Sequence, residues 1–440
     1  MLYTASLLIA AIASVILLSA RFRFNVFFAL LFVAAATGFA AGLDAEKVVG
    51  ALKTGIGSTV EKIGLLIILG ITLGVLLEKS GAMDSLARAM LRRTGQRKAP
   101  LALSMVGYLV GLPIFCDSGF VVLSGLLRSL SERSPGQRLW MVIALSSSLY
   151  AVHCLVPPHP GATAAAGILR ADLGLVMLLG GLVALPVAAA GYFLGKWLSR
   201  WSIVSFEDVA AAPPPHAARL HPALAVPPIL VPIMLIGLKS MLSLSPDYGE
   251  AIVWWSLLQM VGDPVVALFI GILFCIPLLR KMPRADWAPL LDTALAKSGN
   301  ILLLTAAGGA FGEVIKALNI GEVFGQTLAT SGLGLFVPFL LAAVLKTAQG
   351  SSTVAVISAA GIFAPFLPAL GFESDAARSL ALLAMGAGSM VVSHTNDSYF
   401  WVVSKFGDLD EMRALKTYTL TTAAMGATGL LGVWVLWLFV

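Results

Sequence analysis

The sequence predicts an all-α polytopic membrane protein built from two inverted-topology repeats. Of the 440 residues, 58% are hydrophobic and only 12% are charged, which is about half the charged fraction of an ordinary soluble domain. Apolar runs separated by charged turns recur along the chain, and at roughly 20 residues per helix they amount to about ten full spans. Basic residues in such a chain mainly report topology, so the net charge of +6 does not indicate a nucleic-acid partner.

Each candidate span is an apolar segment bounded by charged or turn-forming residues. The first has no basic stretch before it and no convincing cleavage site after it, so we interpret it as a span and not as a signal peptide. In chain order the candidates are 3–20, 24–42, 61–78, 139–169, 173–197, 224–242, 251–279, 300–318, 379–405 and 417–440.

Segment 101–127 behaves differently from these spans. It has basic clusters on both sides and is broken in the middle by GLPIFCDSG (111–119). If both clusters are cytoplasmic, the segment enters and leaves on one face, as a re-entrant hairpin whose tip must be buried in protein or line a cavity. Segment 333–370 is predicted to be a second hairpin. The segments 139–169 and 379–405 are predicted to be broken transmembrane helices.

The basic residues also predict the orientation. Placing the basic turns on the cytoplasmic side assigns 21 of the 29 Lys and Arg residues to that side. Because cytoplasmic loops carry the excess of Lys and Arg, we expect both termini to lie outside. The eight remaining basic residues are external or within the membrane: Lys47, Lys53, Lys62, Arg170, Lys239, Lys316, Lys346 and Arg378.

The chain resembles itself at an offset of 238 residues, where 73–91 is similar to 311–329. The same offset brings each polar interruption of the first half close to one in the second half. Five full spans per half is an odd number, so the second copy must be upside down relative to the first. We therefore predict inverted repeats over 1–201 and 223–440, joined by a cytoplasmic linker at 202–222. Such repeats with broken helices near the midplane are typical of secondary transporters.

Four polar interruptions, two hairpin tips and two broken helices, carry the candidate site. Proline and glycine break the backbone there, and half-helix ends present bare amides that suit an anionic group. The predicted substrate-binding residues are Asp117, Ser118, Gly119, His159, Lys346, Gln349, Gly350, Ser351, Ser352, Thr353, His394, Thr395 and Asn396. The candidates for carrying a proton are Asp117, Asp397, His153 and His394, since ionisable groups are costly in lipid unless they serve a pathway or a counter-ion.

Lys346 is the only cation in the four interruptions. It lies four residues before Gly350, about one helical turn from the break. A desolvated anionic substrate needs a compensating charge, so we predict that Lys346 holds the substrate carboxylate. The alternative is a permanent ion pair with Asp117 or Asp397.

Two classes of enzyme fail on the residues present. A zinc enzyme needs ligands at short helical spacing, whereas His153 and His159 are separated by two prolines. A serine hydrolase needs a G-x-S-x-G elbow, which is absent around Ser351. We therefore expect no enzyme activity, no metal site and no cofactor. A channel is harder to exclude by composition, although an inverted repeat favours an alternately accessed site.

The motifs VPPHPGATAA (156–165), AQGSSTVAVISAAGI (348–362) and SHTNDSYFW (393–401) resemble the gluconate:proton symporter (Gnt) family of bacterial permeases. With the hairpin, the resemblance covers essentially the whole chain. It implies proton-coupled uptake of sugar acids across the cytoplasmic (inner) membrane by an elevator motion, in a homodimer. One departure is that the first tip has Cys116-Asp117 where the family has an aromatic residue followed by glutamate. That difference favours a shorter hydroxy acid, such as glycerate or a four-carbon aldonate, as an alternative to gluconate.

The sequence therefore predicts a secondary active transporter for gluconate or a related small hydroxy-monocarboxylate, driven by protons. Its expected partners are this anion, protons, membrane lipid and a second copy of the chain. One alternative is a sodium-coupled carrier of a small organic or amino acid such as D-serine, in which unwound carbonyls and hydroxyls would hold the ion. The other is a channel for organic anions.

Overall fold

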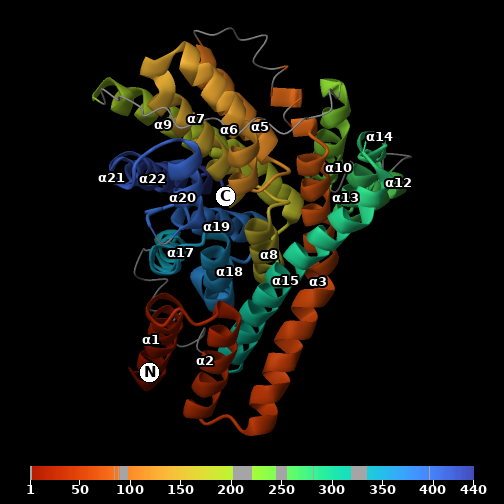
Figure 1. Ribbon diagram of the computed structural model, residues 1–440. Helices are drawn as coiled ribbons and strands as arrows, with labels where there is room; N and C mark the ends of the chain where they lie inside the picture. The colour runs from red at the N-terminus through yellow and green to blue at the C-terminus, as the bar shows by residue number, and fades with distance from the viewer. Residues whose placement is uncertain are drawn as a thin grey trace.

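The computed structural model describes residues 2–83, 85–87, 89, 98–201, 221–243, 255–280, 282–318, 334–395 and 397–440, and all regular structure in these residues is helical (Figure 1). Most of the predicted linker 202–222, and Asn396 of the predicted site, lie outside them. The α-helices are α1 (Leu2–Ile16), α2 (Val26–Ala40), α3 (Ala45–Lys79), α5 (Ala99–Gly111), α6 (Cys116–Arg133), α7 (Arg138–Leu155), α8 (Pro160–Leu169), α9 (Leu173–Trp201), α10 (Val226–Ser243), α12 (Trp255–Val261), α13 (Pro264–Leu273), α14 (Ile276–Leu279), α15 (Trp287–Ala317), α17 (Phe336–Gln349), α18 (Ser352–Phe363), α19 (Asp375–Gly388), α20 (Ser398–Phe406), α21 (Glu411–Ala414) and α22 (Leu420–Trp437).

Two long helices, α3 and α15, pack against each other along the side of the molecule that faces lower right in Figure 1. Glycine allows the close approach, because a Cβ on Gly55 would lie 2.6 Å from the carbonyl oxygen of Gly309. Both helices are longer than the predicted spans 61–78 and 300–318. Hydropathy marks only the most apolar part of a helix, whereas α3 also includes charged residues such as Lys53 and Lys62, and it bends by 48° after Lys62.

The other helices gather around a buried centre made chiefly of α7, α8 and α19. Almost every residue of α7 is buried, and this helix packs against α5, α6 and α9. Helices α17, α18 and α22 cover α19. The centre is polar in places, since Ser146, Ser147 and Ser148 are fully buried. Their hydroxyls donate to carbonyl oxygens of the preceding turn, those of Ile143 and Ala144.

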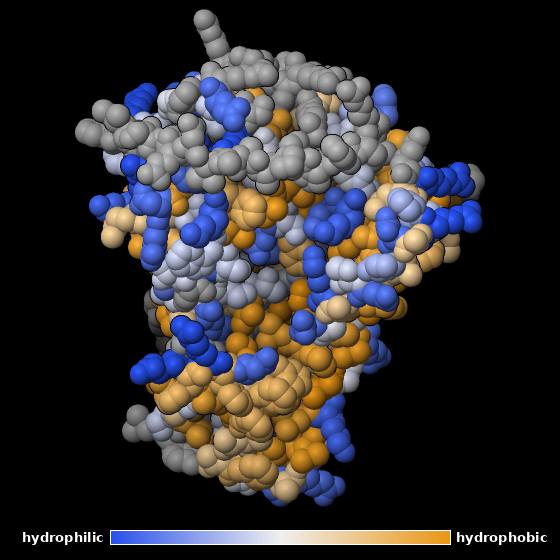
Figure 2. Space-filling model, viewed as in Figure 1, coloured by the Kyte–Doolittle hydropathy of each residue, from blue (hydrophilic) through white to orange (hydrophobic). Residues whose placement is uncertain are grey.

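The outer surface is suited to a bilayer. Large hydrophobic side chains such as Phe193 and Leu182 are exposed on α9, and Figure 2 shows broad hydrophobic surface over the lower half of the molecule with hydrophilic side chains at its lower end. Among the described residues, five helices are long and apolar enough to cross a membrane, and up to seven if each of two bent pairs is one span. The prediction of about ten full spans is therefore only partly matched, because several predicted spans are formed by shorter or broken helices.

All four predicted interruptions coincide with breaks between helices. The chain leaves the helical conformation between α5 and α6, between α7 and α8, between α17 and α18, and between α19 and α20. Helices α5, α17 and α18 have 13, 14 and 12 residues, a rise of about 20 Å against a hydrocarbon core of roughly 30 Å. Whether these segments are re-entrant, and whether the two sets are related by inversion, stay predictions.

Candidate functional site

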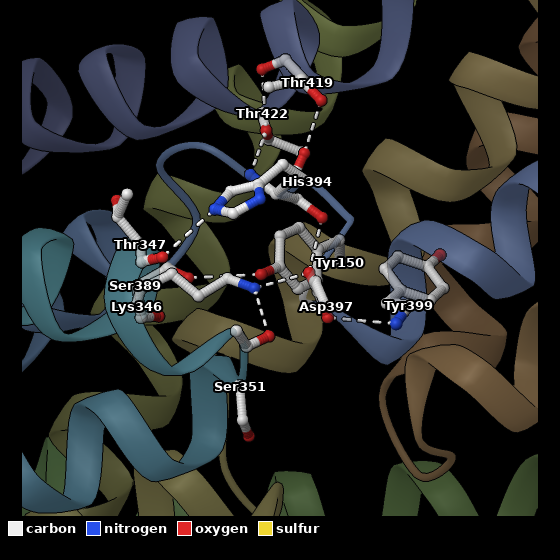
Figure 3. Close-up of polar contacts among 12 residues, drawn as sticks. Tyr150, Lys346, Thr347, Ser351, Ser389, His394, Asp397, Tyr399, Thr419 and Thr422 are labelled. Atoms are coloured by element: carbon white, nitrogen blue, oxygen red, sulfur yellow. Dashed lines mark hydrogen bonds and ion pairs between the residues drawn. The ribbon is translucent and has the colours of Figure 1, made fainter. Parts of the chain in front are cut away.

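A buried ion pair joins two of the breaks. Lys346, in the last turn of α17, donates to the Oδ2 atom of Asp397 at 2.5 Å and to the carbonyl oxygen of Gly350 at 2.7 Å (Figure 3). Lys346 is 0% exposed and Asp397 is 3% exposed. An ammonium has three N–H donors, so these two bonds leave one for a further acceptor. The pair places a buried cation and a buried anion at the junction of both second-half breaks.

The segment between α19 and α20 is held so that Asp397 faces the ammonium. The carboxylate caps α20 by accepting from the backbone N–H of Tyr399 at 3.0 Å, and it accepts from the Ser393 hydroxyl at 2.5 Å. Ser393 is itself anchored, because its backbone N–H donates to the Thr422 hydroxyl and its carbonyl accepts from Thr419. Asp397 is thus positioned by α20 behind it and by α22 beside it (Figure 3).

Two tyrosines from different halves of the chain form an aromatic wall beside this pair. The Lys346 ammonium lies 6.0 Å from the centre of the Tyr150 ring, within the range of a cation–π contact. The Tyr150 and Tyr399 rings are 5.2 Å apart. Their hydroxyls donate to backbone carbonyls, Tyr150 to Ser389 and Tyr399 to Ser146. The wall therefore ties α7 to both helices of the second broken segment.

A second polar chain runs through the two histidines of the first broken helix. The Nδ1 atoms of His153 and His159 are 3.3 Å apart, and the Nε2 atom of His159 lies 2.5 Å from the carbonyl oxygen of Gly111. At its other end, His153 Nε2 lies 3.4 Å from the Thr353 hydroxyl. The chain connects the end of α5, the α7–α8 break and the start of α18.

The groups at the two ends of this chain determine which atom donates in each hydrogen bond. A carbonyl oxygen only accepts, so His159 Nε2 carries a proton, and in a neutral His159 the Nδ1 atom is then an acceptor. The proton between the rings consequently belongs to His153 Nδ1. This leaves His153 Nε2 bare, and the Thr353 hydroxyl must donate to it. The oxygen of the Thr353 hydroxyl can then accept a hydrogen bond from a further donor.

The breaks place four helix N-termini around these two clusters: those of α6, α8, α18 and α20. The start of α8 touches the start of α18, since a Cβ on Gly161 would lie 3.2 Å from the Cα of Thr353. The start of α6 faces the start of α20, because the Phe120 and Tyr399 rings lie 6.3 Å apart and the two helices pack against each other. Bare amides and positive dipole ends at such termini stabilise a bound anion.

The structure brings most of the predicted residues into this region. Asp117, His153, His159, Lys346, Gly350, Thr353 and Asp397 lie in the two clusters. Ser351 caps α18 through its hydroxyl, Ser352 follows it, Gln349 is half-buried at the end of α17, and Ser118 and Gly119 lie in the first turn of α6. Two residues are set apart: His394 is half-exposed with Nε2 3.1 Å from the Thr347 carbonyl, and exposed Thr395 uses its carbonyl to accept from Trp401.

Sequence reasoning missed Tyr150, Ser393 and two threonines, Thr419 just before α22 and Thr422 in its first turn. Tyr150 could have been found, because it precedes His153 by three residues and residues three apart share one face of a helix. Ser393 begins the SHTNDSYFW motif but carries no charge that would have marked it. Nothing local in the sequence links Thr419 and Thr422 to a segment 26 to 29 residues earlier in the chain.

The structure shows for Lys346 the ion pair that the sequence analysis gave as the alternative. The prediction favoured a substrate carboxylate over an ion pair with Asp117 or Asp397, and the structure supplies Asp397. Direct contact with a substrate stays a prediction, and it now requires that the substrate compete with, or join, an existing pair.

Broken helices that meet at a buried ionic site, in a membrane protein whose described residues are helical, are typical of transport proteins. The chain matches the GntP family of permeases over residues 3–440. It therefore belongs to the GntP permease family, as the resemblance of its motifs predicted.

Three relatives in this family are named for sugar acids. The gluconate permease of Pseudomonas aeruginosa is 32% identical over 432 residues, covering 96% of this chain and 95% of the relative. The Gnt-II system L-idonate transporter of Escherichia coli is 31% identical over 439 residues, covering 96% and 97%. The low-affinity gluconate transporter of the same organism is 29% identical and covers 97% of both chains. These proteins are permeases and transporters, and none of the three supports the sodium-coupled or channel alternatives.

A solved structure shares the fold. The transporter YdaH of Alcanivorax borkumensis, whose crystal structure is described as having an unusual topology, aligns with a TM-score of 0.64 over 93% of this chain and 97% of that chain. The sequences are only 18% identical, so the likeness concerns the fold alone.

Proposed function

We propose that the protein imports gluconate or a related small hydroxy-monocarboxylate together with protons across the cytoplasmic membrane. The names of its relatives support the substrate class. The observation that carries the proposal is the buried pair of Lys346 and Asp397 among four helix N-termini. This arrangement offers a cation and bare amides to a carboxylate, together with hydroxyl and histidine groups for a polyhydroxylated tail.

Charge balance gives the proton a role. With Lys346 positive and Asp397 negative, the pair is neutral, and a substrate anion would add one uncompensated buried charge. Such a charge costs several kcal/mol in a medium of low dielectric constant. If Asp397 takes a proton as the substrate enters, its electrostatic attraction to the Lys346 ammonium weakens. The substrate carboxylate then becomes the counter-ion of Lys346. The pair and the bound substrate together stay neutral, and one anion moves with one proton.

The rest of the proposal comes from the sequence. Residues 1–201 and 223–440 act as inverted repeats, and the hairpins and broken helices move as an elevator against a scaffold in a homodimer. Both termini lie outside, as the distribution of Lys and Arg predicts. The short helices α5, α17 and α18 beside the breaks favour this movement, because they hold the site without spanning the membrane themselves.

Uptake into vesicles containing the purified protein tests the function. Labelled gluconate, glycerate and D-serine are offered separately, with either a proton gradient (acid outside) or a sodium gradient. We expect gluconate or glycerate to accumulate when the outside is acid, and sodium to have no effect. Uptake of D-serine alone, or accumulation driven only by sodium, would contradict the proposal. Vesicles without protein control for leakage.

Thr353 is expected to bind a substrate hydroxyl, because its lone pairs are free while its proton is directed to His153. Replacing Thr353 with valine keeps the shape and removes the hydroxyl, so the KM for gluconate should rise roughly tenfold, the value of about one hydrogen bond. Thr353→Ser should stay close to the wild type. Thr305→Val removes a buried hydroxyl of α15 that donates to its own helix and is the matched control. An unchanged KM in Thr353→Val would show that this hydroxyl serves only the histidines.

A further inference from the structure

A basic cavity lies away from the buried site, at the opposite ends of α8 and α18. It has a volume of about 860 Å³, within the range of roughly 300–1,000 Å³ that small-molecule sites occupy. Four cations from four separate elements line it, together with one carboxylate. They are Lys62 of α3, Arg170 at the end of α8, Lys316 and Glu313 of α15, and Arg378 of α19. We name this space the vestibule.

Most of the positive charge that lines the vestibule is not neutralised by a neighbouring carboxylate. Lys316 Nζ lies 3.6 Å from Glu313, with the two side chains 63% and 30% exposed. Arg378 donates to the backbone carbonyl of Arg170 at 3.3 Å, a bond that leaves its charge unneutralised. Among the described residues, no other carboxylate makes a salt bridge with these four cations. Cations gathered in a concave site of low dielectric constant concentrate anions near it.

The vestibule lies at the opposite end of α8 from the buried site. Helices α8 and α18 pack side by side next to α15 (Figure 1). Both begin at the breaks, and the vestibule is lined by Gly167 to Arg170 at the end of α8 and by Ala364 just after α18. Ten residues of α8 rise about 15 Å, so the vestibule lies about one short helix away from His159 and Thr353.

A neighbouring cavity lies along part of α8, between the vestibule and the α7–α8 break. Its volume is about 610 Å³; it shares Lys62, Gly167 and Arg170 with the vestibule, and it is also lined by Thr163 in the first turn of α8 and by the carboxylates Asp172 and Asp375. Thr163 is 1% exposed, and its hydroxyl finds no hydrogen-bond partner in the described part of the chain. A buried hydroxyl without a partner is costly, which a hydroxylated ligand passing along α8 would relieve.

We propose that the vestibule is a second binding site for the carboxylate of the substrate, occupied on the way into the buried site. The proposal rests on the proposed function. It also fits the predicted orientation, because Lys62, Arg170, Lys316 and Arg378 all belong to the minority of basic residues outside the cytoplasmic turns. The vestibule is then the external entrance, and its charge raises the rate at which a dilute anion is captured.

The test removes charge from the vestibule without touching the buried site. The variant Lys62→Gln/Lys316→Gln changes two exposed lysines of the lining. The matched control, Lys47→Gln/Lys53→Gln, removes the same charge from exposed lysines of α3 that do not line the cavity. Initial uptake of labelled gluconate is measured in intact cells lacking other gluconate carriers, against gluconate concentration and at low and high external salt.

At low salt we expect kcat/KM of the vestibule variant to fall roughly tenfold, as lost electrostatic capture implies, with kcat unchanged. The difference should shrink at about 0.5 M salt, where screening acts over a few ångströms. The control should stay within about twofold of the wild type. Equal kinetics for variant and control, or a loss confined to kcat, would overturn the vestibule proposal while gluconate uptake by the wild type upholds the function. If the wild type takes up neither gluconate nor glycerate, both proposals fail.

Lipid phosphate is the competing occupant, and a second arm separates the two. The same variants are compared in vesicles of phosphatidylcholine alone and in vesicles containing phosphatidylglycerol. A loss of kcat/KM in both lipids supports capture of the substrate. A loss seen only with phosphatidylglycerol would assign the cations to lipid headgroups and overturn the proposal.

Discussion

Lys346→Gln is expected to abolish measurable gluconate accumulation and to destabilise the protein. The change removes the cation that we assign to the substrate carboxylate, and it leaves Asp397 buried without its partner. Breaking a buried ion pair by removing one member costs roughly 3–5 kcal/mol. The thermal unfolding midpoint in detergent should therefore fall, and uptake should drop by at least about a hundredfold. Lys405→Gln, at an exposed lysine above the Trp401 ring, is the control.

The double variant Lys346→Gln/Asp397→Asn separates a substrate role from a purely structural one. With both charges gone, neither member of the pair is left buried without its partner, and the unfolding midpoint should return toward that of the wild type. Uptake should stay absent, because the neutral site has no cation for the carboxylate. Recovery of uptake together with stability would show that Lys346 serves only to neutralise Asp397, and would refute the substrate role.

Asp397→Asn alone is expected to remove acid-driven accumulation while exchange of gluconate across the membrane survives. Asparagine caps a helix about as well as aspartate, so α20 should keep its start, and the change reports mainly the lost charge. Because the variant imitates protonated Asp397, its KM for gluconate should be nearly the same at pH 6 and pH 8. In the wild type, acid should lower the KM, since proton uptake accompanies binding. The measurements are gluconate accumulation under a pH gradient and counterflow without one.

Two comparisons sharpen this result. Asp410→Asn makes the same change at an exposed cap, that of α21, and should leave transport unaffected. Asp117→Asn changes the second intramembrane carboxylate, and we expect it to keep its pH dependence. If Asp117→Asn loses acid-driven accumulation and Asp397→Asn does not, the proton belongs to Asp117. Wild-type behaviour in both would move the proton to the pair of His153 and His159.

Added gluconate should rescue the stability of Asp397→Asn. In the empty variant the Lys346 ammonium has lost the carboxylate with which it pairs, whereas a bound carboxylate restores an opposite charge. The unfolding midpoint should therefore rise more with gluconate in the variant than in the wild type, following the linkage between ligand binding and stability. No such difference would indicate that the substrate does not reach Lys346.

The sequence by itself determined the membrane class, the family and the positions of the four breaks. These features are local: apolar runs exceed what a soluble surface tolerates, and proline or glycine interrupts a helix within about one turn of where it stands. GLPIFCDSG, VPPHPG, the glycine at 350 and SHTNDS all fall at breaks in the structure. Lys346 and Asp397 also stood out, because an ionisable residue in an apolar segment is rare without a function.

Only the tertiary structure decided which of these residues meet. From the sequence, either Asp117 or Asp397 was a possible partner of Lys346. The packing of α17 beside the α19–α20 break brings Lys346 to Asp397, 51 residues away. The pairing of His153 with His159, the wall of Tyr150 and Tyr399, and the four cations of the vestibule arise in the same way. Contacts between helices depend on the rotation and depth of each helix in the bundle, which packing of whole faces determines, so hydropathy and spacing along one helix do not specify them.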